Sequence, residues 1–185
     1  MKQQKELIQA MTRNATAVGS VVHEVSSVLD AFQYAVALNK KKKLKTITCP
    51  GLTAEDLEIM SELCKTANLD LLDEILRTKA SSIDSSLTWA DYGIADTGTL
   101  MLASDSEEIR IATMLASIHI AMLPTSKIRP STAGIEKELN DILKKDKPSY
   151  TAFITGPSRT ADIERVLAIG VHGPVEHHLL LLKEV

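Results

Sequence analysis

The last strand-like stretch of the chain constrains the fold most. It runs from about His177 to Leu182, and its final residues, Leu179 to Leu182, are apolar without any alternation. A strand that is apolar on both sides must be covered on both faces, which is typical of an interior strand in a parallel sheet. We therefore expect a sheet that carries covering layers on both of its faces, with this strand inside it.

The first half of the chain shows the alternating order that such a sheet requires. The predicted elements are a helix over 3–14, a strand over 16–22, a helix from Ser26 or Ser27 to about Asn39, a strand over 44–49 and a helix that begins at Thr53 to Asp56. That last segment resembles a capping box, with Asp in place of the usual Glu or Gln. Strands that alternate with helices in this way imply parallel pairing and right-handed crossovers.

The second half is predicted to continue the same domain. Its expected elements are strands over 100–103 and 117–123, a helix from Ser131 or Thr132 to about Lys145, a strand over 150–155, a helix over 161–168 and the final strand. Residues 69–76 fit a strand or a short helix, and residues 81–86 are polar and loop-like. No second-domain boundary is visible, so we expect one domain over 1–185, with residues 1–14 as an N-terminal helix.

Composition and charge exclude several classes of protein. Of 185 residues, 44% are hydrophobic and 24% charged, which is typical of a globular chain rather than a disordered one. A net charge of −3 and an aromatic content of 3% argue against a nucleic-acid partner. The concentrated charge of Lys40 to Lys43 lies at a predicted helix end, where cations meet the negative end of the helix dipole. A patch for an anion or a partner is the alternative.

Cysteine content and hydropathy indicate a cytoplasmic protein without a cofactor of its own. The two cysteines, Cys49 and Cys64, cannot complete a tetrahedral zinc site or an iron–sulfur cluster by themselves. Cys64 is expected in the core. Cys49 lies at the carboxyl end of a predicted strand, where binding sites of α/β proteins gather, but a structural role is expected for it too. Residues 1–6 lack a signal-peptide core, and the apolar stretch over 114–123 is too short to span a membrane.

The segment from Thr155 to Thr160 has the strongest chemical character. It joins a predicted strand to a predicted helix, whose free N–H groups favour an anion. Gly156 permits a close backbone approach, Ser158 and Thr160 supply hydroxyls, and Arg159 can pair with a carboxylate or phosphate. The alternative is an ordinary capped turn in which Thr160 is the N-cap.

A second candidate segment is the turn over residues 96–99. Gly98 allows a tight turn, Thr97 and Thr99 supply hydroxyls, and Asp96 can bind a substrate or act as a general base. The alternative is a turn in which Asp96 accepts hydrogen bonds from neighbouring amides.

A third candidate segment, residues 170–174, places His172 between glycines, where it can act as an acid, a base or a ligand. A histidine satisfied by backbone groups is the alternative. His177 and His178 are adjacent, so in a strand they point to opposite faces and form a poor metal pair. His119 is expected to be an ordinary strand residue, and no metal site is predicted.

Taken together, three segments strongly resemble one known family. They are Asp91 to Leu100, Ile154 to Glu164 and Gly170 to Pro174, and they resemble the LUD domain, the lactate-utilisation protein C family. The likeness is strongest over about residues 89–183 and weaker over about 15–88. It implies a three-layer α/β/α Rossmann-like domain with a mainly parallel sheet, similar to ribose-5-phosphate isomerase, glucosamine-6-phosphate deaminase and CoA transferases.

The resemblance also implies a function. It suggests an accessory subunit that supports the oxidation of L-lactate to pyruvate, with the iron–sulfur clusters on partner subunits. The alternative is a free-standing enzyme that binds a small anionic ligand, such as an organic acid, a sugar phosphate or a CoA ester. Asp96 or His172 is then the candidate proton carrier. The residues expected to bind the anion are Gly156, Ser158, Arg159 and Thr160. A homo-oligomer is compatible with either function. If each turn follows the carboxyl end of a parallel strand, all three should line one cleft.

Overall fold

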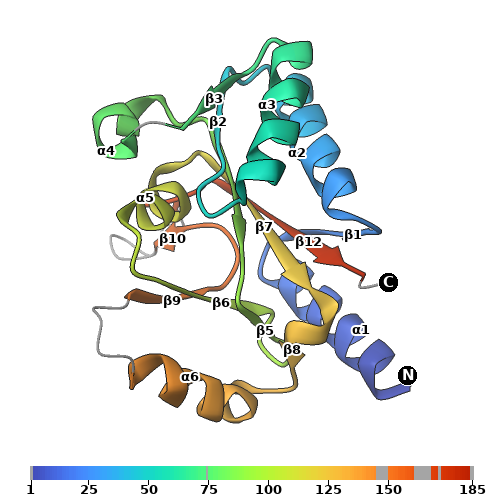
Figure 1. Ribbon diagram of the computed structural model, residues 1–185. Helices are drawn as coiled ribbons and strands as arrows, with labels where there is room; N and C mark the ends of the chain where they lie inside the picture. Colours follow the sequence, from blue (N-terminus) through green and yellow to red (C-terminus); the bar gives the residue numbers. More distant parts are fainter. Residues whose placement is uncertain (1, 74, 145–149, 161–167, 171, 184–185) are drawn as a thin grey trace.

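The computed structural model of the chain describes residues 2–73, 75–144, 150–160, 168–170 and 172–183. Figure 1 shows the arrangement of its elements. In chain order these are α1 (Lys2–Ala17), β1 (Val21–Val25), α2 (Val28–Lys42), β2 (Thr46–Thr48), α3 (Ala54–Ala67), β3 (Asp70–Leu72), α4 (Leu76–Lys79), η1 (Ala80–Ser82), β4 (Ser85–Trp89), β5 (Tyr92–Ile94), β6 (Thr99–Ser104), α5 (Glu107–Leu115), β7 (Ile118–Pro124), η2 (Thr125–Lys127), β8 (Ile128–Arg129), η3 (Thr132–Ile135), α6 (Glu136–Leu143), β9 (Tyr150–Ile154), β10 (Arg159–Thr160), β11 (Ala168–Ile169) and β12 (Glu176–Leu182).

The main sheet of the described chain is parallel and six-stranded, in the order β1-β12-β7-β4-β2-β3. Strand β12 lies between β1 and β7, so that Leu179 pairs with Val22 on one side and Ala121 on the other. The side chains of Leu179, Leu180 and Leu181 are completely buried. The prediction of an α/β fold with this strand inside a mainly parallel sheet is therefore confirmed.

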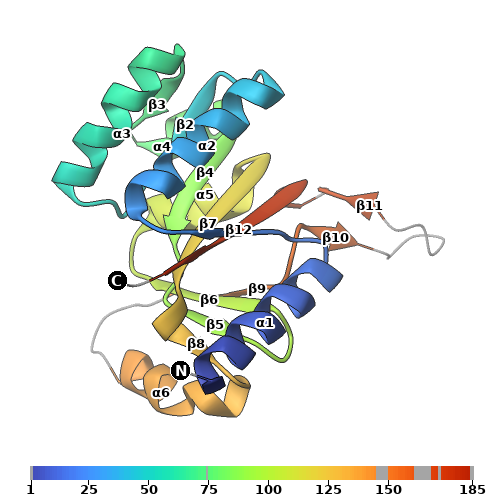
Figure 2. The same ribbon diagram turned by 90° about the vertical axis from the view of Figure 1, so that its right-hand side faces the viewer.

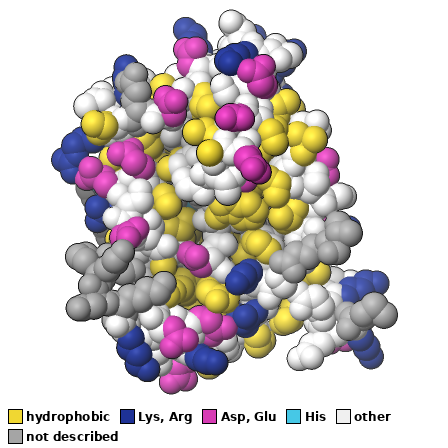
Figure 3. Space-filling view, in the orientation of Figure 1, with side chains coloured by type: hydrophobic (Ala, Val, Ile, Leu, Met, Phe, Trp, Pro, Cys, Tyr) yellow, Lys and Arg dark blue, Asp and Glu magenta, His cyan; other side chains and the backbone are white. Residues whose placement is uncertain are grey.

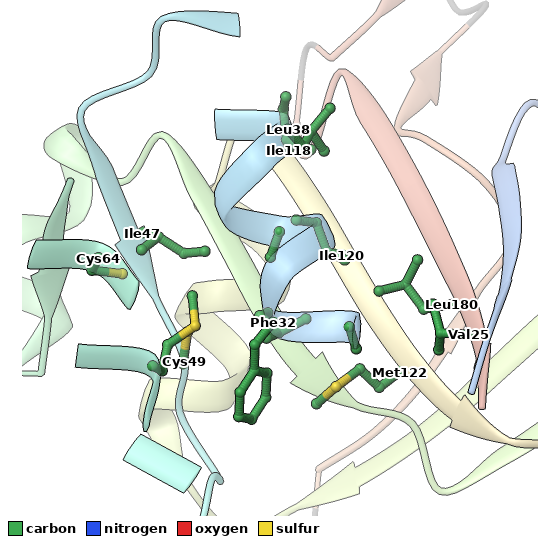
Figure 4. Close-up of a cluster of buried hydrophobic side chains, with 14 of the residues drawn as sticks. Val25, Phe32, Leu38, Ile47, Cys49, Cys64, Ile118, Ile120, Met122 and Leu180 are labelled. Carbon is green, nitrogen blue, oxygen red and sulfur yellow. The ribbon is translucent and has the colours of Figure 1, made fainter. Parts of the chain in front are cut away.

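Helices α2 and α3 cover one face of the main sheet. Phe32 of α2 and Met60 of α3 pack with Ile47 and Ile120 of the sheet, and all four side chains are fully buried. Figure 4 shows this cluster, with Cys64 of α3 in it. Cys64 therefore lies in the core, as predicted.

The other face is covered by α1 and by a second, smaller sheet (Figure 2). Met11 and Ala15 of α1 pack against Leu123 of β7 and Leu181 of β12. The second sheet has the order β8-β5-β6-β9, and β6 pairs antiparallel with both β5 and β9. Helix α6 closes its outer side, where Leu139 packs near Met101.

This second sheet was not anticipated from the sequence. Strands were predicted over 100–103 and 150–155, and both exist as β6 and β9, but neither belongs to the parallel sheet. A short strand carries a pattern of apolar side chains that fits either sheet. The antiparallel pairing of β5 and β6 arises from the short turn between them, which returns the chain directly alongside itself.

Helix starts are fixed by the predicted hydroxyl caps. The Ser27 Oγ accepts a hydrogen bond from the Asp30 N–H at 3.1 Å, and the Thr53 Oγ1 accepts one from the Asp56 N–H at 3.1 Å. Each cap is worth about 1 kcal/mol. At the end of α2, the Lys42 Nζ lies 2.5 Å from a Glu176 carboxylate oxygen, so part of the lysine run is paired across the protein surface.

Two local predictions were wrong. The strand expected over 16–22 begins only at Val21, because α1 continues to Ala17 and the chain then turns at Gly19, whose φ is +92°. The polar stretch over 81–86 already contains the start of β4. Its Ser85 and Ser86 are fully buried because their hydroxyls donate to a side-chain oxygen of α2 and a carbonyl oxygen of α5.

The helix predicted over 161–168 falls largely on residues 161–167, which lie outside the described part of the chain. Ala168 is in strand β11, which pairs antiparallel with β10, so Arg159 and Thr160 are strand residues. Within the described residues, no helix is long and apolar enough to cross a membrane.

Candidate functional site

The turn between β5 and β6 lies directly on the end of α1. Gly98 has φ +65°, and a Cβ placed on it would be 2.2 Å from the backbone nitrogen of Ala15. The side-chain amide of Asn14 donates to the carbonyl oxygens of Ala95 at 2.7 Å and Asp96 at 3.0 Å. Glycine is therefore required at position 98, because α1 occupies the space that any side chain would need.

The turn after β9 reaches the same end of α1. Gly156 has φ +71°, and a Cβ there would be 2.2 Å from the carbonyl oxygen of Val18. The Pro157 ring approaches Gly19, the next residue, to within 3.4 Å of its Cβ position. Thr155 joins this turn to the first one, because its Oγ1 is 2.8 Å from the Oγ1 of Thr99.

The third turn packs against the second. The Ser158 N–H donates to the Pro174 carbonyl at 2.8 Å, and the Ser158 carbonyl accepts from the Gly170 N–H at 2.9 Å. A Cβ on Gly173 would be 3.1 Å from the Cβ of Ser158. The three predicted turns and the end of α1 therefore form one continuous junction, on the right-hand side of the view in Figure 2. We call it the α1 junction, comprising residues 14–20, 95–99, 155–158, 170 and 172–174.

The α1 junction lies at the amino ends of β1 and β12, and the expectation of a cleft at the carboxyl ends was wrong. Residues 14–20 lead into β1, and residues 172–174 lead into β12. Residues 155–158 follow β9, which is a strand of the second sheet and not of the parallel sheet. The rule for parallel sheets therefore did not apply to this turn.

The predicted site residues divide into a buried and an exposed set. Gly98, Thr99 and Gly156 are buried; Ser158 and Thr160 are partly buried; Asp96, Thr97, Arg159 and His172 are exposed. No hydrogen bond or ion pair between Asp96 and His172 occurs among the described residues. Thr160 lies in β10, and the helix N-terminus that was predicted to follow it falls on residues 161–167, outside the described part of the chain. Arg159 is exposed, so its side chain is able to pair with a carboxylate or phosphate.

Beneath the α1 junction lies a pair of buried histidines that the sequence analysis did not single out. His119 of β7 and His177 of β12 pair in register, and their ring centroids are 5.2 Å apart. The Ser20 Oγ lies 2.8 Å from His177 Nδ1, and the Thr88 Oγ1 lies 2.9 Å from His119 Nε2. Ser20, which contacts His177, directly follows Gly19, which lies against Pro157. The histidine pair is therefore connected to the α1 junction through these two neighbouring residues.

Burial keeps both imidazoles neutral. Desolvation, followed by the influence of His177, lowers the pKa of His119 well below its usual value. Desolvation, followed by the influence of His178, lowers the pKa of His177 to about 4. The other nitrogen of each ring, His119 Nδ1 and His177 Nε2, is buried and has no hydrogen-bond partner among the described residues. Unpartnered buried polar atoms are rare and often mark a functional position.

A sequence signal for this pair did exist. His119 lies between Ile118 and Ile120 in a wholly apolar strand, where a polar side chain is costly unless it is used. As predicted, His177 and His178 point to opposite faces: the Nδ1 of His178 lies 2.8 Å from the hydroxyl of Tyr34 on α2. No histidine side chain is visible on the described part of the face in Figure 3, where acidic and basic groups are interspersed around exposed hydrophobic side chains.

A separate cavity of about 250 Å³ lies at the carboxyl ends of β2 and β3. Cys49 and Thr48 line it together with Leu72, Ser106 and Glu108. Burial raises the pKa of the Cys49 thiol far above its usual value, so that the thiol is protonated and a poor nucleophile. None of the residues from the three candidate turns lines this cavity, and no group of three or more side chains able to hold a metal occurs in the described part of the chain.

Comparison with known proteins gives relatives over most of the chain. A lactate utilization protein C of Halalkalibacterium halodurans is 35% identical over 113 residues, which are 60% of this chain and 49% of that protein. An uncharacterized protein of Escherichia coli, YkgG, is 28% identical over 98% of this chain and 81% of its own length. The matched parts make up about half the length of the lactate utilization proteins that head the comparison.

A solved structure supports the fold. The crystal structure of a DUF162 family protein from Deinococcus radiodurans superimposes with a TM-score of 0.64 over 97% of this chain and 98% of that one, at 16% sequence identity. The sequence model of the LUD domain matches residues 8–182, a range that contains the whole α1 junction. With that range covering nearly the whole of the fold described above, the chain belongs to the LUD domain family.

Proposed function

We propose that this protein is an accessory subunit of a lactate-utilisation system and supports the oxidation of L-lactate to pyruvate alongside partners that carry iron–sulfur clusters. Relatives named lactate utilization protein C, at 32 to 36% identity, support the lactate role. The chain has only two cysteines, and both are buried in the core. Electron transfer through clusters therefore falls to the partners.

The α1 junction is the proposed site of this function, and a small carboxylate is its proposed ligand. The observation that carries the proposal is the meeting of three chemically rich turns, distant in sequence, on one helix end. Arg159 at the edge of the junction is exposed and can pair with a carboxylate, and the hydroxyls of Thr97 and Ser158 can donate to it. A purely structural junction would not need these side chains.

Growth and co-purification test the role in lactate utilisation. A strain lacking this protein should lose growth on L-lactate but keep growth on pyruvate. A tagged copy purified from lactate-grown cells should bring down proteins with the absorption of iron–sulfur clusters. Unimpaired growth on lactate without the protein would refute the role, and a tagged copy recovered alone would refute the accessory assignment.

Binding measurements test the ligand. Calorimetric titration with L-lactate, pyruvate or phosphate should show weaker binding, by about tenfold, for Arg159→Ala than for the unaltered protein. Arg77→Ala is the matched control, because Arg77 is an exposed arginine on α4, outside the α1 junction. Equal binding by Arg159→Ala and Arg77→Ala would remove Arg159 from the site.

The second candidate function is that of a free-standing enzyme acting on an organic acid, a sugar phosphate or a CoA ester. It is favoured by the exposure of Asp96 and His172, which leaves both side chains able to meet a substrate. A purified protein that converts a substrate without partners would favour this function. Unchanged activity in Asp96→Asn and His172→Gln would then exclude these residues as proton carriers.

A further inference from the structure

Hydrogen bonding and burial together favour one arrangement of the protons on the buried histidine pair. Among the described residues, the hydroxyl of Ser20 has the Nδ1 of His177 as its hydrogen-bond partner, and the hydroxyl of Thr88 has the Nε2 of His119. If each O–H donates to its ring nitrogen, only the second ring nitrogen of each histidine stays unpaired among the described residues, whereas the reverse direction leaves a hydroxyl hydrogen unpaired as well; we therefore infer that each O–H donates. The hydrogen bond made by one nitrogen of a neutral imidazole determines that the other nitrogen carries the proton.

Two buried N–H donors therefore result, His119 Nδ1–H and His177 Nε2–H, and neither has an acceptor among the described residues. The rings lie on neighbouring strands with their centroids 5.2 Å apart and their planes at 47°. A pair of donors without an acceptor is complemented by an atom that only accepts. A carboxylate oxygen is such an atom, whereas a water or an alcohol brings hydrogens that need acceptors of their own.

We propose that His119 Nδ1 and His177 Nε2 donate hydrogen bonds to the carboxyl group of a small organic acid, with Ser20 and Thr88 as the positioning residues that hold the two rings. This inference rests on the proposed function, since it assigns a deeper binding point to the carboxylate expected at the α1 junction. The two sites are adjacent in the chain: Ser20 follows Gly19, which contacts the turn of Gly156 and Pro157.

Packing alone does not explain two histidines at this location. Leu123 of β7 and Leu181 of β12 are apolar side chains that point to the same face of the sheet as the two histidines and are fully buried there. Apolar residues at positions 119 and 177 would satisfy packing without leaving donors unpaired, a condition that costs about 1 to 3 kcal/mol for each group. A bound acceptor removes that cost and contributes affinity.

Nitrogen NMR of the unaltered protein is the first test. The imidazole spectra should show His119 protonated at Nδ1 and His177 protonated at Nε2. Titration with sodium L-lactate, pyruvate or acetate should shift these two nitrogens and saturate, whereas sodium chloride at the same ionic strength should not. Opposite tautomers would overturn the inference. A spectrum unchanged by all three acids would do so too, and would indicate a buried water only.

Matched substitutions are the second test. The amide nitrogen of glutamine lies near the position of a histidine Nε2, and that of asparagine near a histidine Nδ1. We expect His177→Gln and His119→Asn to bind lactate within a few fold of the unaltered protein, and His177→Asn and His119→Gln to bind at least about tenfold more weakly. Similar affinity within both pairs would contradict the proposed donors. If a variant does not fold, the NMR titration of the unaltered protein still decides.

The two proposals can fail separately. Imidazole shifts with the acids, in a protein that proves dispensable for growth on lactate, would leave the binding pair in place and refute the lactate role. A protein that is essential for growth on lactate, but whose two imidazoles do not respond to any of the acids, would refute the histidine pair alone.

Discussion

As the pH falls, His177 should lower the free energy of unfolding of this protein at pH values above those at which the carboxylates titrate. The pKa of His177 is about 4 in the folded protein against 6.5 without the fold, and the cause is burial. The unfolded chain therefore binds more protons than the folded one between these values. The free energy of unfolding is at its maximum above pH 6.5, falls as the pH drops, and stops falling on this account below about pH 4.

The magnitude follows from the two pKa values. At pH 5 the difference in proton binding lowers the free energy of unfolding by about 2 kcal/mol relative to pH 8, for His177 alone. His119 adds to the loss in the same direction, because burial lowers its pKa as well. Glu176 does not contribute in this range, since its pairing with Lys42 holds its pKa below the usual 4.5.

Urea unfolding followed by the fluorescence of Trp89 measures this effect at pH 8, 6.5 and 5. His177→Gln should lose about 2 kcal/mol less than the unaltered protein between pH 8 and pH 5, whatever its stability at pH 8. The pH 8 data serve as the reference, because the imidazole is neutral there in both states. A free energy of unfolding that is constant from pH 8 to pH 5, or an equal loss in His177→Gln, would refute the reasoning.

Three further outcomes are expected. Gly98→Ala should destabilise the protein by at least about 2 kcal/mol in urea, through positive φ and the contact with Ala15, whereas Gly134→Ala, which lacks a positive φ, should cost clearly less; equal costs would contradict the packing described for the α1 junction. Thr53→Ala should cost about 1 kcal/mol by removing the cap of α3, and a thermal melt unchanged by it would show that the cap contributes nothing. Cys49 should react with iodoacetamide at least about tenfold more slowly in the folded protein than in urea, because burial raises the pKa of its thiol; similar rates would mean that the thiol is accessible.

The sequence predicted the parallel sheet because its signals are local and strong. The apolar run of β12 requires cover on both faces, and the hydroxyl caps at Ser27 and Thr53 mark the starts of α2 and α3. The second sheet escaped prediction because nothing in a short strand such as β9 says which partner it pairs with. That choice depends on contacts between distant segments, such as β6 with β9.

The candidate site was predicted in its parts and misplaced as a whole. The three turns do meet, but their common support is α1, whose sequence carries no sign of that role. The buried pair of His119 and His177 was not predicted, because His177 was compared with its neighbour His178 and His119 was expected to be an ordinary strand residue. The pair becomes evident from the register of β7 with β12 and from two ring nitrogens that have no partner among the described residues.

The way α1 meets the turns has a consequence for how this region tolerates change. Gly98 and Gly156 touch α1 and the residue after it through peptide atoms, the nitrogen of Ala15 and the carbonyl of Val18. Every amino acid supplies the same peptide group, so position 18 can exchange one side chain for another and still present the same surface. The two glycines cannot be exchanged in this way, because any side chain there would collide with those peptide atoms. The packing of α1 against the turns therefore depends on glycine at both positions.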